Sequence, residues 1–365
     1  MKIVEATGWR RKIGLREPYT IASDEGLRTF DHCDLCFVRL VAEDGTVGLG
    51  SGSAGERVTG ESADDTATAL ADLSGLRGLD VRRFGGVLAE VAEGLHATPA
   101  AAAAVDMALH DLHTRGLGVP LVDWLGRRGA PRMTSVTLGI ESVEASLESA
   151  RRLRDRGFRC FKVKVGGDAE ADEERLTRLR ELLGAEALLR IDANEGYDLG
   201  TSLRLDDLVQ RLDLELVEQP LPRIDPVSDA NALRALPESL RRHLAIDESL
   251  VAPADALAFV GPPPACGIFN VKLMKCGGVA PALAIARIAE EAGIELMWGC
   301  MDESRLSIAA ALHAALASPA TRYLDLDGSF DLEDDPVTGG FRLVEGVLHL
   351  LDAPGLGVEI EGAAS

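Results

Sequence analysis

Residues 161–192 read FKVKVGGDAEADEERLTRLRELLGAEALLRID, and this stretch decides how the fold is interpreted. It begins with an apolar run that contains Lys162 and Lys164, and it ends with a second apolar run that closes at Asp192. Residues i and i+2 of a β-strand point to the same face, so the two lysines project side by side. Burying two neighbouring ammonium groups is unfavourable unless an anion or carboxylates compensate. The pattern therefore indicates either a ligand-binding strand or an exposed edge strand, where paired lysines are common.

Short apolar runs alternate with amphipathic segments at a steady period from about residue 132 onward. Successive run ends are 25 to 29 residues apart, which suits one strand, one helix and two short loops. Alternating units of this size predict a parallel sheet, and eight even repeats favour a closed (β/α) barrel of the TIM type over an open sheet. The runs end near Leu138, Lys164, Asp192, Glu218, Asp247, Lys272, Trp298 and Asp325.

The residues before the barrel predict a smaller α+β domain. A hairpin is expected over 34–53, since Asp44-Gly45 separates two alternating runs, and Gly48 to Gly55 should make the segment after it pliant. The remaining predictions are a strand over 1–15, a polar loop over 16–31, helices over 62–75, 82–95 and 98–116, and a C-terminal hairpin that packs back on this domain. The predicted domains are a capping domain over 1–125, completed by 330–365, and a catalytic barrel over 126–329.

Composition excludes several classes of function. The net charge of -21 argues against nucleic acid and anionic membranes as partners. No segment resembles a signal peptide and no apolar run is long enough to span a bilayer, so a cytoplasmic location is expected. The six cysteines are scattered, which predicts free thiols, and Cys33-x-x-Cys36 without a second pair is interpreted as structural.

Charged residues that core packing does not favour stand at the ends of successive strands. Asp192, Glu218 and Asp247 end the third, fourth and fifth strands, and Lys164 and Lys272 lie four strands apart. The carboxyl ends of barrel strands form one ring, where barrel enzymes keep their sites. Three hard oxygen ligands there suit Mg²⁺. Each aspartate alone could instead cap a following helix, but five positions that fit one period favour a site.

The order of the motifs KxK, D-A-N, E-Q-P, D-E-S and N-V-K-L-x-K-x-G-G closely resembles the enolase superfamily, in its muconate-lactonizing-enzyme subgroup, over essentially the whole chain. The resemblance implies abstraction of a proton alpha to a carboxylate, with the enediolate held by Mg²⁺. It implies three metal ligands (Asp192, Glu218, Asp247), two acid/base lysines (Lys164, Lys272) and an electrostatic helper beside the enolate oxygen (Lys162).

The physical chemistry agrees with these roles. An alpha proton of a carboxylate is too weakly acidic to be lost to an amine unless a cation stabilises the developing charge. Mg²⁺ and the neighbouring lysines are expected to favour the neutral amine form that Lys164 needs as a base. Two lysines on opposite faces allow one to remove a proton while the other delivers one, which inverts the carbon. This predicts a racemase or epimerase.

Asp325 and Asp327 share a face at the end of strand eight, and this D-x-D resembles the dipeptide epimerases, of the L-Ala-D/L-Glu epimerase kind, where the pair binds the substrate's N-terminal ammonium. A solvated loop start is the structural alternative. We therefore expect an Mg²⁺-dependent dipeptide epimerase that inverts the alpha carbon of the C-terminal residue. The alternatives are an N-succinylamino-acid racemase or a muconate or chloromuconate cycloisomerase of the same subgroup. A non-catalytic relative would have lost a ligand or a lysine, and this sequence has lost none.

Further substrate contacts are expected at Asp302, Thr137 and Asp24. The loop from Arg16 to Phe30 should close over the site, as capping-domain loops do in this family. Asp24, Glu25 and Asp302 favour a cationic substrate side chain, whereas Arg28 would suit an anionic one. The expected partners are a small dipeptide and further copies of this chain as a homo-oligomer.

Overall fold

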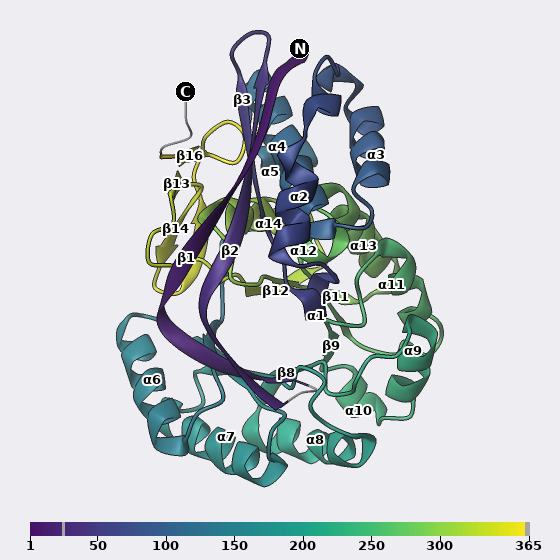
Figure 1. Cartoon of the computed structure of the whole chain (residues 1–365). Helices are drawn as coiled ribbons and strands as arrows, with labels where there is room; N and C mark the ends of the chain where they lie inside the picture. The colour runs from purple at the N-terminus through teal and green to yellow at the C-terminus, as the bar shows by residue number, and fades with distance from the viewer. Residues whose placement is uncertain (24–25, 362–365) are drawn as a thin grey trace.

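The computed structural model describes residues 1–23 and 26–361, with only the backbone described at residue 19, at residues 21–23 and at residues 26–28. Eight parallel strands lie in the order β12-β11-β10-β9-β8-β7-β6-β5, and the ring closes where Thr134 bridges Leu324 (Figure 1). The predicted barrel is thus confirmed. Its strands are β5 (Val136–Leu138), β6 (Cys160–Lys164), β7 (Leu188–Asp192), β8 (Leu214–Glu218), β9 (Leu244–Ile246), β10 (Ile268–Val271), β11 (Glu295–Gly299) and β12 (Thr321–Asp325).

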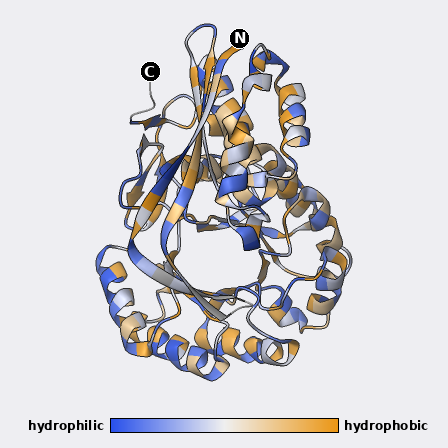
Figure 2. Ribbon diagram, in the orientation of Figure 1, coloured by the Kyte–Doolittle hydropathy of each residue, from blue (hydrophilic) through white to orange (hydrophobic). Residues whose placement is uncertain are grey.

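Amphipathic helices surround the barrel, and their local sequences explain where they begin. The Asp168 side chain caps one helix by accepting from the N–H groups of Glu170 and Ala171, and Asp198 caps the next. Hydrophobic and hydrophilic residues alternate around most of these helices (Figure 2), which bury one stripe against the strands, whereas the helix over Arg305–Ala317 is buried on nearly all sides. The helices are α6 (Val143–Asp155), α7 (Ala169–Leu183), α8 (Leu199–Leu212), α9 (Pro226–Arg234), α10 (Glu238–Arg241), α11 (Pro253–Phe259), α12 (Leu273–Cys276), α13 (Val279–Ala292) and α14 (Arg305–Ala317).

The N-terminal part is a three-stranded antiparallel sheet with helices packed on it, as predicted. Gly48, Gly50 and Gly52 do not make a pliant segment, which corrects the prediction. A Cβ on Gly50 would lie 1.8 Å from the carbonyl oxygen of Ala104, so these glycines let a helix pack directly on a strand. The elements are β1 (Ile3–Ser23), β2 (Gly26–Ala42), β3 (Val47–Ser53), α1 (Glu56–Thr59), α2 (Ala63–Ala71), η1 (Ser74–Leu76), η2 (Val81–Arg83), α3 (Phe84–Gly94), α4 (Pro99–Leu117) and α5 (Leu121–Leu125).

The predicted polar loop over residues 16–31 is wrong, because most of this segment continues β1 and β2 as a long ribbon. The register between the two strands shifts between Gly14 and Tyr19, which accommodates Pro18. The ribbon crosses the mouth of the barrel (Figure 1) and is tied to the β5–α6 unit by two contacts. The N–H of Ile140 donates to the carbonyl of Thr20 over 2.9 Å, and Glu17 pairs with Arg152 of α6 over 2.9 Å.

The C-terminal segment forms short strands, and in the described residues 326–361 no helix follows β12. A hairpin of β14 (Phe341–Val344) and β15 (Val347–Leu350) pairs with β4 (Arg132–Met133), and β13 (Val337–Gly339) pairs with β16 (Val358–Ile360). The predicted contact with the N-terminal part is present, since the N–H of Gly355 donates to the Val119 carbonyl. The domain boundary at residues 125 and 126 stays a prediction.

All six cysteines are free thiols, as expected. None of the helices in the described parts of the chain is both long and apolar enough to cross a bilayer.

Candidate active site

The ends of β6, β7 and β8 place three of the predicted site residues at one level. In the strand register, Lys164 lies opposite Asp192, and Asp192 lies opposite Glu218. Asp247 directly follows β9, the next strand around the ring. The side chains of Asp192, Glu218 and Asp247 are completely buried. The structure therefore brings the three predicted metal ligands together at the carboxyl end of the barrel.

This acidic set is unfavourable without positive charge. Burial, together with repulsion from Asp192 and Asp247, raises the pKa of Glu218 to about 8. Among residues 1–23 and 26–361, no group of three or more His, Cys, Asp or Glu side chains is already arranged to hold a metal ion. Lysine ammonium groups contact these acids instead: Lys162 contacts Asp192 and Glu218, and Lys164 contacts Asp192. Three carboxylates form an oxygen donor set that fits Mg²⁺. These residues are chemically suited to hold such an ion.

Each predicted catalytic lysine is paired with one of these acids. Lys164 donates to Asp192 Oδ2 over 2.7 Å, and Lys272 donates to Asp247 Oδ2 over 2.6 Å. Burial disfavours the charged form of Lys272, but Asp247 and Glu218 outweigh it and raise the pKa of Lys272. Because β6 and β10 are four strands apart in an eight-stranded ring, the two lysines approach the pocket from opposite sides.

Lys162 lies deeper than Lys164, 3% exposed, and contacts three acids. Its Nζ lies 3.3 Å from Asp192 Oδ2 and 3.4 Å from Glu218 Oε2, and it donates a hydrogen bond to Asp325. Burial opposes its charge, yet these carboxylates raise the pKa of Lys162 well above its ordinary range. Lys162 is thus a fixed positive charge beside the predicted reaction centre.

The two aspartates of the D-x-D motif have different surroundings. Asp325 is buried, with one oxygen toward Lys162 and the other accepting from Ser135 Oγ over 2.5 Å. Asp327 is half-buried and accepts from the backbone N–H of Thr137 over 2.7 Å. Burial, then repulsion from Asp325, raises the pKa of Asp327 to about 7. A cation bound beside the pair would relieve this repulsion.

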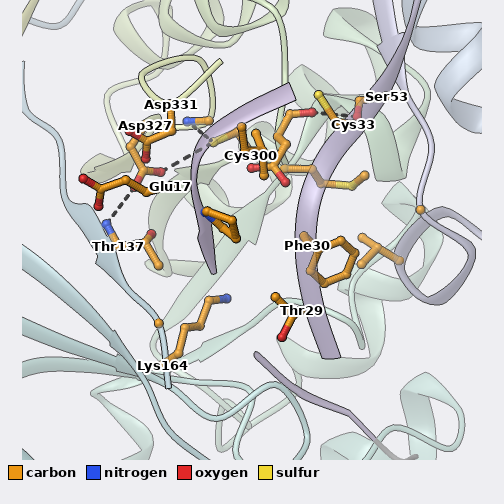
Figure 3. Close-up of a pocket in the computed structure, with 18 of the residues that line it drawn as sticks. Glu17, Thr29, Phe30, Cys33, Ser53, Thr137, Lys164, Cys300, Asp327 and Asp331 are labelled. Atoms are coloured by element: carbon orange, nitrogen blue, oxygen red, sulfur yellow. Dashed lines mark hydrogen bonds between the residues drawn. The ribbon is translucent and has the colours of Figure 1, made fainter. Parts of the chain in front are cut away.

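A cavity of about 480 Å³ joins these groups, and its volume suits a small organic ligand. Figure 3 shows Lys164 pointing into the cavity from the barrel, with Thr29 and Phe30 of the ribbon facing it and Asp327, Asp331 and Glu17 at one end. Asp302 also lines the cavity, and its carbonyl accepts from Ser53 Oγ over 2.7 Å. Asp24 lies outside the described residues, as does Glu25, and the side chain of Arg28 is not described either.

Several polar residues that the sequence interpretation left without a role hold the charged set in place. Lys275 of α12 donates to Asp247 Oδ1 over 2.5 Å and to the Asp247 carbonyl over 2.6 Å. Asn270 Nδ2 donates to Glu218 Oε1 over 2.7 Å, and Gln219 Oε1 accepts from the Asp247 N–H over 2.9 Å. The motifs D-A-N, E-Q-P and N-V-K-L-x-K contained this signal, because each places a polar residue beside a charged one in an apolar strand.

Two sequence profiles match the chain. One, described as mandelate racemase / muconate lactonizing enzyme, N-terminal domain, covers residues 5–126, and the other, described as enolase C-terminal domain-like, covers residues 145–364. The chain belongs to the enolase superfamily. The expected family resemblance is thereby confirmed.

Enolase-superfamily relatives match over nearly the full length. The L-Lys-D/L-Arg epimerase of Methylococcus capsulatus is 52% identical over 98% of this chain and 99% of its own. The L-Lys-D/L-Arg epimerase of Desulforapulum autotrophicum is 45% identical over the same shares. A crystal structure of the dipeptide epimerase from Methylococcus capsulatus, complexed with Mg and the dipeptide L-Arg-D-Lys, superposes with a TM-score of 0.94 at 52% identity, over 98% of this chain and 99% of that one.

Proposed function

We propose that this enolase-superfamily chain is an Mg²⁺-dependent dipeptide epimerase that inverts the alpha carbon of the C-terminal residue by 1,1-proton transfer. One observation carries the proposal: Lys164 and Lys272 enter one cavity from opposite sides of the barrel, and the Asp325–Asp327 pair lies in the wall of the same cavity. Relatives that match over 98% of this chain are dipeptide-acting epimerases, which supports the same reaction here.

The chain's own residues divide the reaction into binding and proton transfer. Asp327, with Asp325 behind it, binds the ammonium group of the N-terminal residue and so places the C-terminal alpha carbon between the two lysines. One lysine removes the alpha proton while the other delivers a proton to the opposite face, so each acts as base for one configuration and as acid for the other. Lys162, held by Asp325, places its positive charge where the enolate oxygen develops.

Asp192, Glu218 and Asp247 are the residues that would hold Mg²⁺. When bound, the ion would supply positive charge that stabilises the negative charge developing on the substrate carboxylate. The crystal structure of the Methylococcus capsulatus epimerase, which contains Mg, supports the proposed need for this ion.

We further propose that the preferred dipeptides carry cationic side chains. Eleven acidic residues and six basic ones line the cavity, and three of the six are the lysines at the reaction centre. Glu17, Asp331 and Asp302 belong to this acidic lining. The relatives at 52% and 45% identity are L-Lys-D/L-Arg epimerases, which supports the same preference.

The test is a dipeptide library incubated in D₂O with Mg²⁺ and read by mass spectrometry. The proposal predicts a gain of one mass unit, largest for dipeptides of Lys and Arg, together with the appearance of a second diastereomer. No gain with any L,L-dipeptide would refute the epimerase. Exchange on N-succinyl amino acids but not on free-amine dipeptides would favour the racemase alternative. Exchange that is confined to acidic or uncharged dipeptides would contradict the cationic preference.

We also propose that the protein works in the cytoplasm as a homo-oligomer. Six free thiols suit a reducing compartment. Light scattering coupled to size-exclusion chromatography tests the oligomer, and a single peak at the monomer mass of 38.7 kDa would contradict it.

A further inference from the structure

The two opposed lysines are held in different ways. Lys164 Nζ has two acceptors, Asp192 Oδ2 at 2.7 Å and Asn194 Oδ1 at 3.0 Å. The side-chain partner of Lys272 is the Asp247 carboxylate. An amide oxygen therefore contacts the lysine on one face of the cavity, in addition to a predicted metal ligand.

Asn194 is itself fixed at two points. It follows β7 with a left-handed φ of 41°, and its backbone N–H donates to Asp192 Oδ1 over 3.0 Å. Its side-chain Nδ2 donates to Glu248 Oε1 over 3.1 Å. The amide has one donor end and one acceptor end, so the bond to the Glu248 carboxylate turns the acceptor oxygen toward Lys164.

Glu248 is suited to this role by its position. It is 4% exposed, follows Asp247 directly and lines the cavity. Its second oxygen, Oε2, is buried and has no hydrogen-bond partner among the residues that the structure describes. The bond to Asn194 is therefore the one that holds this side chain within the described part of the chain.

We infer that Asn194, oriented by Glu248, is a positioning residue for Lys164 and acts on one of the two proton-transfer faces only. The inference rests on the proposed function, in which Asp192 is engaged by the metal ion. The amide oxygen of Asn194 is not one of the proposed metal ligands, so it stays available as an acceptor for Lys164. An amide oxygen accepts from the lysine nitrogen whether or not that nitrogen carries the proton being transferred, so it can hold the side chain throughout the reaction.

The experiment compares solvent exchange at the two faces. Each diastereomer of a reactive dipeptide is incubated separately in D₂O with Mg²⁺, and the initial rate of alpha-deuterium incorporation is measured by NMR. The diastereomer whose exchange disappears in Lys164→Ala defines the Lys164 face. Asn194→Gly removes the amide and tolerates the left-handed backbone, so it avoids strain.

Asn194→Gly is expected to lower exchange at the Lys164 face by about 10- to 100-fold, the range for a misplaced catalytic group, while exchange at the Lys272 face changes less than about twofold. Glu248→Leu should show the same one-sided loss. Glu248→Gln keeps an acceptor oxygen and should lose less than Glu248→Leu. Calorimetric titration with Mg²⁺ checks that the variants still bind the ion.

An equal loss at both faces, or no loss at the Lys164 face, would overturn the inference while leaving the epimerase proposal intact. A parent protein that exchanges no dipeptide would instead refute the proposed function. A crystal structure of Asn194→Gly tests the inference without any measurement of activity. The inference predicts that Lys164 Nζ leaves its present position in this variant while Lys272 Nζ does not. An unmoved Lys164 would overturn it.

Discussion

Lys275→Met removes one of the four ammonium groups that balance the buried acids, and we expect a large loss of stability. Lys275 is 2% exposed, and its Nζ contacts Asp247 Oδ1 at 2.5 Å, the Asp247 carbonyl at 2.6 Å and the Asn270 carbonyl at 3.1 Å. Burial opposes ionisation of Asp247, but Lys272 and Lys275 outweigh it and lower the pKa of Asp247. Removing one partner of a buried ion pair typically costs about 3–5 kcal/mol, and methionine replaces the volume of the stem but not the charge.

The measurement is urea unfolding at neutral pH in the presence of EDTA, followed by circular dichroism. The matched control is Lys12→Met, because Lys12 lies exposed on β1 and surface substitutions change stability by about 0.5 kcal/mol or less. We expect a free energy of unfolding about 3–5 kcal/mol below the parent for Lys275→Met alone. A loss smaller than about 1 kcal/mol would refute the reasoning, since it would mean that Asp247 does not need Lys275 as a counter-charge.

Three further predictions concern catalysis, binding and pH. Lys164→Ala should abolish epimerisation yet still exchange the alpha proton of the diastereomer that Lys272 serves, and Lys272→Ala should show the complementary pattern. The remaining exchange rates, about 10² to 10⁴ below the parent, are measurable by NMR in D₂O. Exchange of the same diastereomer by both variants would contradict the assignment. Asp327→Asn should raise KM for free-amine dipeptides by about tenfold or more while changing KM for N-acetylated dipeptides little, because only the former carry the ammonium group; equal effects would argue against ammonium binding. Burial lowers the pKa of His313 to about 4, so the unfolded chain binds a proton that the native protein does not, and stability should fall by up to about 3 kcal/mol as pH falls from 6.5 to 4. His313→Asn keeps an acceptor for the Val122 N–H and should flatten this part of the pH profile; an unchanged profile would contradict the prediction.

The barrel could be predicted because its signal is repeated. Each unit of strand, loop, helix and loop fixes the distance to the next strand end, so a charged residue at one strand end predicts where its counterpart lies. Lys164, Asp192 and Glu218 indeed lie at one level in neighbouring strands. The spacing of strand ends in the sequence therefore predicts which side chains meet in the ring.

The ribbon over residues 16–31 could not be predicted in the same way. Pro18 and the surrounding charged residues are typical of a loop, and local composition does not reveal that the segment lies over a cavity. Its two strands pair with each other, but the contacts that hold the ribbon over the barrel come from residues far away in the chain, such as Ile140, which bonds Thr20, and Arg152, which pairs with Glu17. These contacts exist only once the barrel has formed.

The supporting polar residues were hidden for a different reason. Lys275 stands three residues after Lys272, in a position where a lysine on a short helix is usually exposed to solvent. Its burial depends on the direction of α12, which turns the side chain toward Asp247. Asn194 likewise looks like an ordinary turn residue until its amide is seen between Lys164 and Glu248.

The most direct test of the central claim is NMR of L-Arg-L-Lys in D₂O with the purified protein and Mg²⁺. The account predicts that the C-terminal alpha-proton signal disappears, that the signals of the L-Arg-D-Lys diastereomer grow in, that the N-terminal alpha proton is retained, and that EDTA stops the reaction. Deuterium at the N-terminal alpha carbon, exchange that persists in EDTA, or no change in a dipeptide of this charge would contradict it.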